Sequence, residues 1–130
     1  MSTDDGPLLQ LEIEKRPDAI IVHCAGKVVI ESWTEFSVAV RGLISEGKRI
    51  DVDLANVTQV DSVGIGTFVS VWASARKAGR ELKFINLNER IQDLFDITRL
   101  HGLFGSEVPR KPGEAPKVGA AKAPKRGSPR

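Results

Sequence analysis

One serine stands where an alternating apolar pattern gives way to apolar residues at helical spacing, within Asp-Ser-Val-Gly-Ile-Gly at residues 61–66. The pattern therefore places Ser62 at the mouth of a helix, where its hydroxyl is expected to cap the first turn. The same hydroxyl could carry a phosphate, which would bring about −1.5 to −2 charges beside Asp61. Gly64 and Gly66 add no side chains to shield the hydroxyl, so the backbone of a partner could approach closely.

The catalytic motifs that use such a serine are incomplete in this chain. A hydrolase elbow needs Gly two residues before the serine, where the chain has Val60. Neither His23, in a predicted strand, nor His101, near the predicted end of the domain, is placed as a catalytic base. The glycines are not followed by Lys-Ser or Lys-Thr, and no His/Cys cluster has metal-ligand spacing. We therefore expect no enzyme, cofactor or metal, and keep a hydrolase or phosphotransferase that uses Ser62 only as an alternative.

Other polar and aromatic residues receive structural interpretations. Asp53 lies near a strand end, as in a response-regulator phosphoacceptor, but the acidic pair and lysine of that chemistry are not evident. Asp51 and Asp53 are instead expected to be solvated positions of a half-buried strand. Trp33 and Trp72 lie on apolar helical stripes and are expected to pack in the core. Cys24 is the only cysteine and lies in an apolar run, which predicts a small buried hydrophobe.

The order of patterns predicts a layered α/β domain, with a mixed sheet of four to five strands and three to four helices. Ser32 and Glu35 form a capping box, Asn88 can cap the third helix, and Gly47 and Gly79 can end the first two. The expected elements are strands over residues 9–14, 19–25, 49–54 and 81–86; helices after Ser32, from about Val63 to Ala78, and after Asn88; a loop over residues 55–61; and a last packed segment with Leu100, Leu103 and Phe104.

Charge divides the chain into a body and a tail. Residues 106–130 hold seven Lys and Arg against two Glu, so the net charge of +2 hides a body at −3 and a tail at +5. The tail is also rich in proline, which predicts disorder. We expect a flexible N-terminus over 1–7, one domain over 8–105 and a disordered basic tail over 106–130. The tail lacks interleaved aromatic residues, so direct nucleic-acid binding is not expected.

Without a long apolar run or a basic leader, the sequence predicts a cytoplasmic protein that does not insert into membranes.

The central residues resemble the STAS domain, the sulfate transporter and anti-sigma factor antagonist module. The resemblance rests on Asp53-Leu54, Val57 and the Asp-Ser-Val-Gly-Ile-Gly stretch, and it covers about residues 8–105. In the bacterial stand-alone members, the serine of this motif is phosphorylated by a partner anti-sigma factor that is itself an ATP-using kinase. The unphosphorylated antagonist binds that factor and frees the sigma factor, and a phosphatase resets the antagonist.

The resemblance implies that Ser62 is the phosphorylated residue, while ATP is bound by the partner. It also implies a contact surface on the first turns of the helix, where residues 63, 66, 67 and 70 share one side. Many members have Gly-Glu-Leu-Asp before the first helix, but this chain has Gly26-Lys27-Val28-Val29 and so lacks those acidic residues. The alternative within the same fold is a non-switching scaffold, beside a lipid-transport ATPase or in a stress-signalling complex. The expected contact residues are Asp61, Ser62, Val63, Gly64, Gly66, Thr67 and Ser70.

Overall fold

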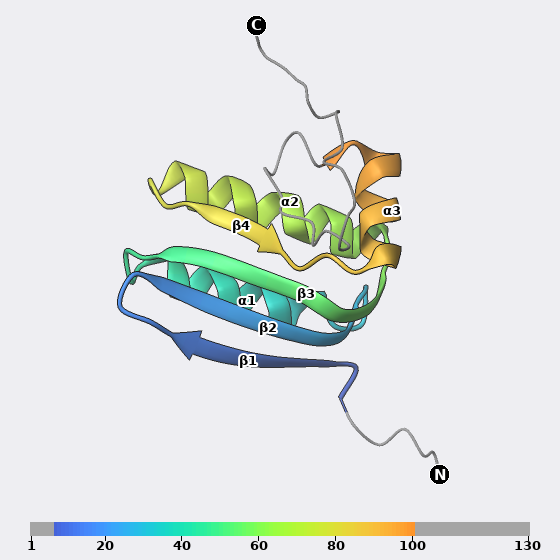
Figure 1. The fold of residues 1–130 in the computed structure, drawn as a ribbon, viewed down its shortest axis with the longest axis horizontal. Coiled ribbons are helices and arrows are strands. Elements are labelled where there is room, and N and C mark those ends of the chain that lie inside the picture. The colour runs from blue at the N-terminus through green and yellow to red at the C-terminus, as the bar shows by residue number, and fades with distance from the viewer. Residues whose placement is uncertain (1–6, 101–130) are drawn as a thin grey trace, which may run out of the picture.

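The computed structural model describes residues 7–100, which form a mixed four-stranded sheet with helices (Figure 1). Along the chain the elements are β1 (Leu9–Lys15), β2 (Ala19–Val28), α1 (Trp33–Ile44), β3 (Arg49–Val60), α2 (Ser62–Lys77), β4 (Leu82–Ile85) and α3 (Glu89–Thr98). The strands lie in the order β1-β2-β3-β4; β1 and β2 form an antiparallel hairpin, and the other pairs are parallel. The predicted α/β class and mixed sheet are therefore confirmed.

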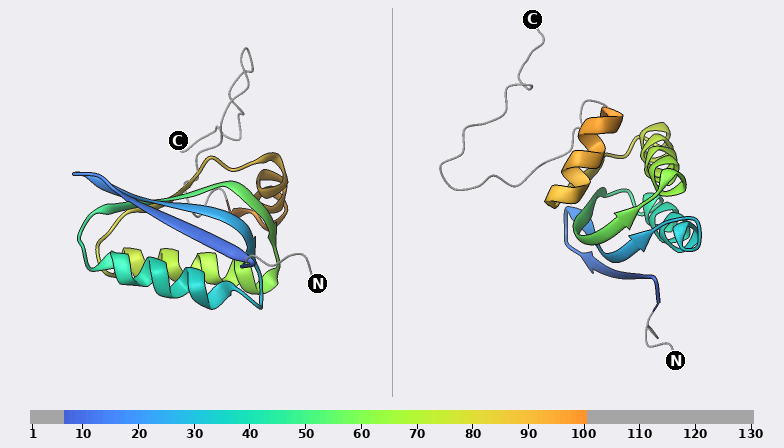
Figure 2. Two further views of the ribbon diagram at one scale, coloured as in Figure 1. Left: turned by 90° about the horizontal axis from the view of Figure 1, so that it is seen from below. Right: turned by 90° about the vertical axis from the view of Figure 1, so that its right-hand side faces the viewer.

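Helices α1 and α2 lie side by side across one face of the sheet, and α3 lies at the end where β3 leads into α2 (Figures 1 and 2). Parallel strands require long crossovers, and here α1 and α2 supply them. Both helices consequently begin at the same end of the sheet. This arrangement brings the loop before α1 next to the start of α2.

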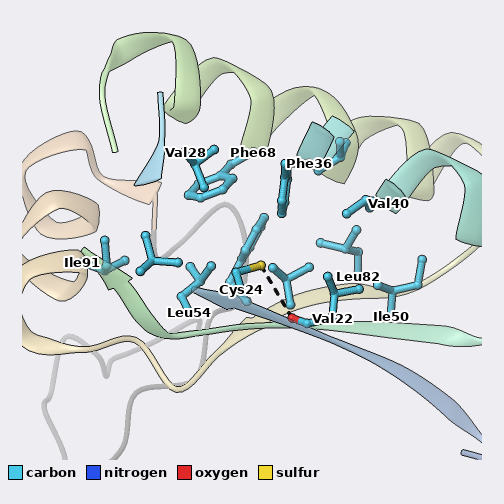
Figure 3. Packing of buried hydrophobic residues seen from close by; sticks show 14 of the residues in the cluster. Val22, Cys24, Val28, Phe36, Val40, Ile50, Leu54, Phe68, Leu82 and Ile91 are labelled. Carbon is cyan, nitrogen blue, oxygen red and sulfur yellow. Dashed lines mark hydrogen bonds between the residues drawn. The ribbon is translucent and has the colours of Figure 1, made fainter. Parts of the chain in front are cut away.

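The core lies between the sheet and its covering helices (Figure 3). Four phenyl rings meet within it: the Phe68 centroid lies 5.3 Å from that of Phe36, 5.0 Å from Phe84 and 6.3 Å from Phe95. Since Phe95 belongs to α3, this helix packs into the same core as α1 and α2. Cys24 is buried there as predicted, and desolvation raises the pKa of its thiol to about 12.

The third strand is longer than predicted. Residues 55–61 were expected to form a loop, but β3 continues beside β2 until Val60 pairs with Val28. Two shifts of register interrupt this pairing. Beside these shifts, the Asn88 side-chain amide donates hydrogen bonds to the carbonyls of Leu54, Ala55 and Val57. The strand therefore runs directly into the residues that begin α2.

Most helix ends agree with the sequence signals. Asn88 caps α3, since its side-chain oxygen accepts a hydrogen bond from the Ile91 amide at 3.0 Å. Gly47 and Gly79, just after α1 and α2, have φ angles of 81° and 78°, which other residues rarely adopt. Leu100 is buried as expected. The predictions for Leu103, Phe104, His101, the basic tail and most of the N-terminus lie outside the described residues.

Two expectations for the start of α1 are wrong. Ser32 is the N-cap residue, but its side chain makes no capping hydrogen bond and no capping box with Glu35 forms. Its hydroxyl instead donates to the Lys27 carbonyl at 2.5 Å and accepts from the Val29 amide at 3.1 Å, which closes the β2–α1 loop. Trp33, expected in the core, is exposed because it precedes the part of α1 that covers the sheet.

Trp72 on α2 fits its core interpretation better. Its side chain is half-buried and packs against the core cluster. The Arg76 guanidinium lies 5.1 Å from the centre of its ring, one helical turn further on.

The face of the sheet opposite α1 and α2 carries paired polar residues. His23 on β2 lies between two carboxylates, with Nδ1 3.0 Å from Asp53 Oδ2 and Nε2 2.9 Å from Glu14 Oε1. Asp51 is buried and accepts hydrogen bonds from the Arg49 guanidinium at 3.1 and 3.2 Å. The expectation that Asp51 is solvated is therefore wrong, because Arg49 on the same strand covers and neutralises it.

Within residues 7–100, no helix has the length and apolar character needed to span a membrane.

Candidate functional site

Asp61 is the N-cap of α2 and joins two segments of the chain. Its Oδ1 accepts a hydrogen bond from the Gly64 amide at 2.9 Å, and its Oδ2 accepts one from the Ile30 amide at 3.0 Å. The bond from Gly64, with a smaller contribution from Ile30, lowers the pKa of Asp61 below its ordinary value. Asp61 therefore remains ionised at neutral pH and links the start of α2 to the loop before α1.

Ser62 is the first residue of α2, one position after the cap. The expectation that the Ser62 hydroxyl caps the helix is wrong. Asp61 occupies the cap position, and its carboxylate accepts the hydrogen bond from the Gly64 amide. The Ser62 side chain is exposed, and its hydroxyl has no hydrogen-bond partner among residues 7–100. It is thus an accessible hydroxyl at the positive end of the helix dipole.

Gly64 is needed for the packing of α2 against the end of β2. A Cβ at this position would lie 2.1 Å from the Val28 carbonyl oxygen and 2.7 Å from a Val60 methyl group. The idea that Gly64 leaves room for a partner is therefore wrong, since its missing side chain admits the protein's own backbone. Thr67 also faces inward, and its hydroxyl donates to the Val63 carbonyl at 2.7 Å. Gly64 and Thr67 lie beneath the expected contact surface.

The other expected contact residues gather on the outer side of α2. Ser62, Gly66 and Ser70 are exposed and spaced by four residues, so they follow one side of the helix; together with Ser74 they are called the α2 ridge below. A Cβ on Gly66 would meet no atom within 4 Å. Nothing within the described part of the chain therefore requires glycine at position 66. Val63 is half-buried beside the ridge.

Two exposed apolar residues near the ridge were not recognised from the sequence. Ile30 is 60% exposed in the β2–α1 loop, and Trp33 is 38% exposed at the first turn of α1. The hydrogen bond from the Ile30 amide to Asp61 places this loop against the residue that precedes Ser62. The available signal was the apolar run that continues from Val28 to Ile30. In the same loop Val29 is buried in the core, so the apolar pattern alone does not show which of these side chains is exposed.

The described residues give Ser62 no catalytic partner. Both ring nitrogens of His23 are engaged by Glu14 and Asp53, on the face of the sheet opposite α1 and α2. Within residues 7–100, no group of three or more His, Cys, Asp or Glu residues is arranged to hold a metal ion. The arrangement can present a hydroxyl to a group-transferring protein and a surface for that protein to bind.

Comparison with known proteins connects these features to a family. The STAS domain model matches residues 10–115. The anti-sigma-B factor antagonist of Bacillus subtilis (strain 168) is 32% identical over 92 residues, which cover 71% of this chain and 84% of that protein.

Solved structures show the same fold at low sequence identity. An anti-sigma factor antagonist from Mycobacterium paratuberculosis aligns with a TM-score of 0.70 at 15% identity, covering 82% of this chain and 90% of the other. The Bacillus cell fate determinant SpoIIAA in its phosphorylated form aligns with a TM-score of 0.60 at 12% identity, covering 79% and 94%. Since the family model spans most of its length, this chain belongs to the STAS domain family.

Proposed function

We propose that this chain is an anti-sigma factor antagonist whose binding is switched by phosphate on Ser62. The unmodified protein binds a kinase-type anti-sigma factor through the α2 ridge and releases the sigma factor. The anti-sigma factor uses its own ATP to phosphorylate Ser62, and the modified protein dissociates until a phosphatase restores it. We assign this exchange to the cytoplasm. The observation that carries the proposal is the exposed Ser62 hydroxyl at the start of α2, which has no hydrogen-bond partner among residues 7–100, in a relative of proteins named anti-sigma-B factor antagonists.

The position of the cap explains how phosphate can alter binding without unfolding the domain. Asp61, not Ser62, caps α2, so modification of Ser62 removes no hydrogen bond between described residues. A phosphate at the first helical position also interacts favourably with the helix dipole, by about 0.3–1 kcal/mol. The phosphorylated SpoIIAA structure, which shares this fold, is consistent with such tolerance.

Phosphate on Ser62 is expected to destabilise the complex with the partner rather than the free protein. Burying an anion against a partner without a matched cation costs several kcal/mol, and each 1.4 kcal/mol weakens binding about tenfold. Asp61 adds a second negative charge at the same place, because its lowered pKa keeps it ionised. Dissociation is therefore the expected result of modification.

The test uses the purified chain with a purified kinase-type anti-sigma factor and ATP. Phosphate is mapped by mass spectrometry, and affinity is measured by calorimetric titration before and after modification. Ser62→Ala is expected to remain bound in the presence of ATP, whereas Ser62→Asp binds at least tenfold more weakly with a similar melting temperature. Ser45→Ala, which changes an exposed serine at the opposite end of α1, provides the matched control and should behave as wild type.

Two results would contradict the proposal. Absence of phosphate on Ser62 despite tight binding would favour the non-switching scaffold. Equal affinity of Ser62→Asp and wild type would show that a negative charge at this position does not control binding.

A further inference from the structure

The guanidinium group of Arg41 is held in one orientation at the outer edge of the α1–α2 contact. Its Nε donates to the Ser37 hydroxyl at 3.0 Å, and its Nη1 donates to the Ser74 hydroxyl at 2.6 Å. Its Nη2 donates to the Ser70 hydroxyl. Ser37 lies on the same helix as Arg41, whereas Ser70 and Ser74 belong to the α2 ridge. Three neutral hydroxyl groups therefore position a cation without neutralising it.

Arg41 differs in this respect from Arg16 and Arg49. Arg16 and Arg49 each pair with a carboxylate, at 2.7 and 3.1 Å, but Arg41 forms no ion pair within residues 7–100. A guanidinium has five N–H donors, and three of those on Arg41 are used by the serines. One N–H on each terminal nitrogen remains. The side chain is exposed, so both donors can reach a group outside the protein.

The location of Arg41 connects it to the candidate switch. Ser70 follows Ser62 by eight residues on the same side of α2, a separation of about 12 Å along the helix. One face of a typical protein interface covers about 800 Å² and readily includes both positions. A protein bound over Ser62 would therefore also cover the oriented cation.

We propose that Arg41 pairs with a carboxylate of the anti-sigma factor; this inference rests on the proposed function. A guanidinium and a carboxylate can form two parallel hydrogen bonds, and an arginine already held in place loses less side-chain freedom on binding. A polyanion such as nucleic acid fits less well, because the carboxylate of Asp61 lies at the start of the same helix. The chemistry selects an acidic side chain of a folded partner.

The experiment compares Arg41→Gln, Arg41→Lys and Arg41→Glu in the full chain, titrated with the same purified anti-sigma factor at several salt concentrations. Arg41→Gln should bind roughly tenfold more weakly and with less dependence on salt. Arg41→Lys should keep the salt dependence of wild type, because the positive charge remains. Its affinity should lie between those of wild type and Arg41→Gln, because lysine lacks the fixed geometry of the guanidinium. Arg41→Glu should bind most weakly of the three. Arg90→Gln removes an exposed cation from α3 and should bind like wild type.

A double-mutant cycle tests the role of the serines. Combined Ser70→Ala and Ser74→Ala should weaken binding severalfold more when Arg41 is present than beside Arg41→Gln, where only the direct contacts of the two serines with the partner are lost. Circular dichroism and melting temperatures establish whether each variant is folded at the temperature of titration. An equal loss in both backgrounds would overturn the positioning role, because the serines would then act independently of Arg41.

The failure of this inference is distinguishable from failure of the proposed function. Wild-type affinity and salt dependence for Arg41→Gln would overturn the inference alone. Equal losses for Arg41→Lys and Arg41→Gln, with an unchanged salt dependence, would likewise show that Arg41 only supports helix packing. Failure of wild type to bind any kinase-type anti-sigma factor would overturn the proposed function and this inference with it.

Discussion

Gly64 and Gly66 should respond in opposite directions to the same substitution, although both lie in the first turns of α2. An alanine Cβ at position 64 would lie 2.1 Å from the Val28 carbonyl oxygen, whereas ordinary contacts begin at 3.4 Å. The start of α2 must therefore move away from β2 by about 1.3 Å. Such overpacking costs about 1–3 kcal/mol, more than the 0.5–1 kcal/mol that alanine contributes to a helix. Gly64→Ala is expected to destabilise the domain.

Gly66→Ala is expected to stabilise the fold and weaken partner binding. Its Cβ meets no atom within 4 Å, so the helix-forming advantage of alanine, about 0.5–1 kcal/mol, is not opposed by a clash. For a domain of this size, 1 kcal/mol shifts the melting temperature by roughly 4–8 °C. The added methyl group stands on the α2 ridge beside Ser62 and should hinder a partner that contacts the helix closely.

Urea denaturation followed by circular dichroism, together with titration of the anti-sigma factor, separates these effects. Gly66→Ala should raise the unfolding midpoint and lower affinity severalfold, a combination that loss of folding cannot produce. Gly64→Ala should lower the midpoint. Unchanged stability of Gly64→Ala would refute the packing argument, and a stabilised Gly66→Ala with full affinity would refute contact at the ridge.

Two further predictions concern the sheet. The hydrogen bond to Glu14, followed by that to Asp53, raises the pKa of His23 above its ordinary value despite the opposing effect of burial. Stability from His23 should therefore be fully present below the unfolded pKa of about 6.5 and disappear as pH rises through the folded pKa. Urea titrations across this range should show a steeper fall for wild type than for His23→Gln; parallel curves would contradict the coupling. Burial and a pKa of about 12 should make Cys24 react with a thiol reagent at least a hundredfold more slowly in the folded protein than in urea, and similar rates would contradict its buried position.

The sequence predicts the elements of this fold better than their lengths. Local alternation and helix signals are enough to locate the strands and helices, because each buries one apolar face. The second half of β3 is missed because Asn56, Thr58 and Gln59 are polar and exposed. This segment is a strand because of its pairing with β2 and the hydrogen bonds from Asn88, which lies about thirty residues later. A local sequence pattern does not reveal contacts with residues that lie far away along the chain.

The site shows a similar limit at the level of single residues. The motif locates Ser62, but Asp and Ser are both favoured N-caps, so composition alone does not distinguish Asp61 from Ser62 as the cap. Gly64 and Gly66 are chemically identical, yet one contacts the backbone of β2 and the other faces open space. Arg41 meets Ser70 and Ser74 only after α1 and α2 pack together, so sequence reasoning had no basis for selecting it.

In the proposed switch, Asp61 has a structural role and its neighbour Ser62 has a regulatory role. Asp61 holds the start of α2 and the Ile30 loop through two amides, and it stays charged while doing so. Phosphate on Ser62 would place about −2.5 to −3 charges at one helix end when Asp61 is included. Water can solvate this charge on the free protein, but a bound partner excludes that water. The same modification can therefore leave folding nearly unchanged and still disfavour the complex, because only binding requires the combined charge to be buried.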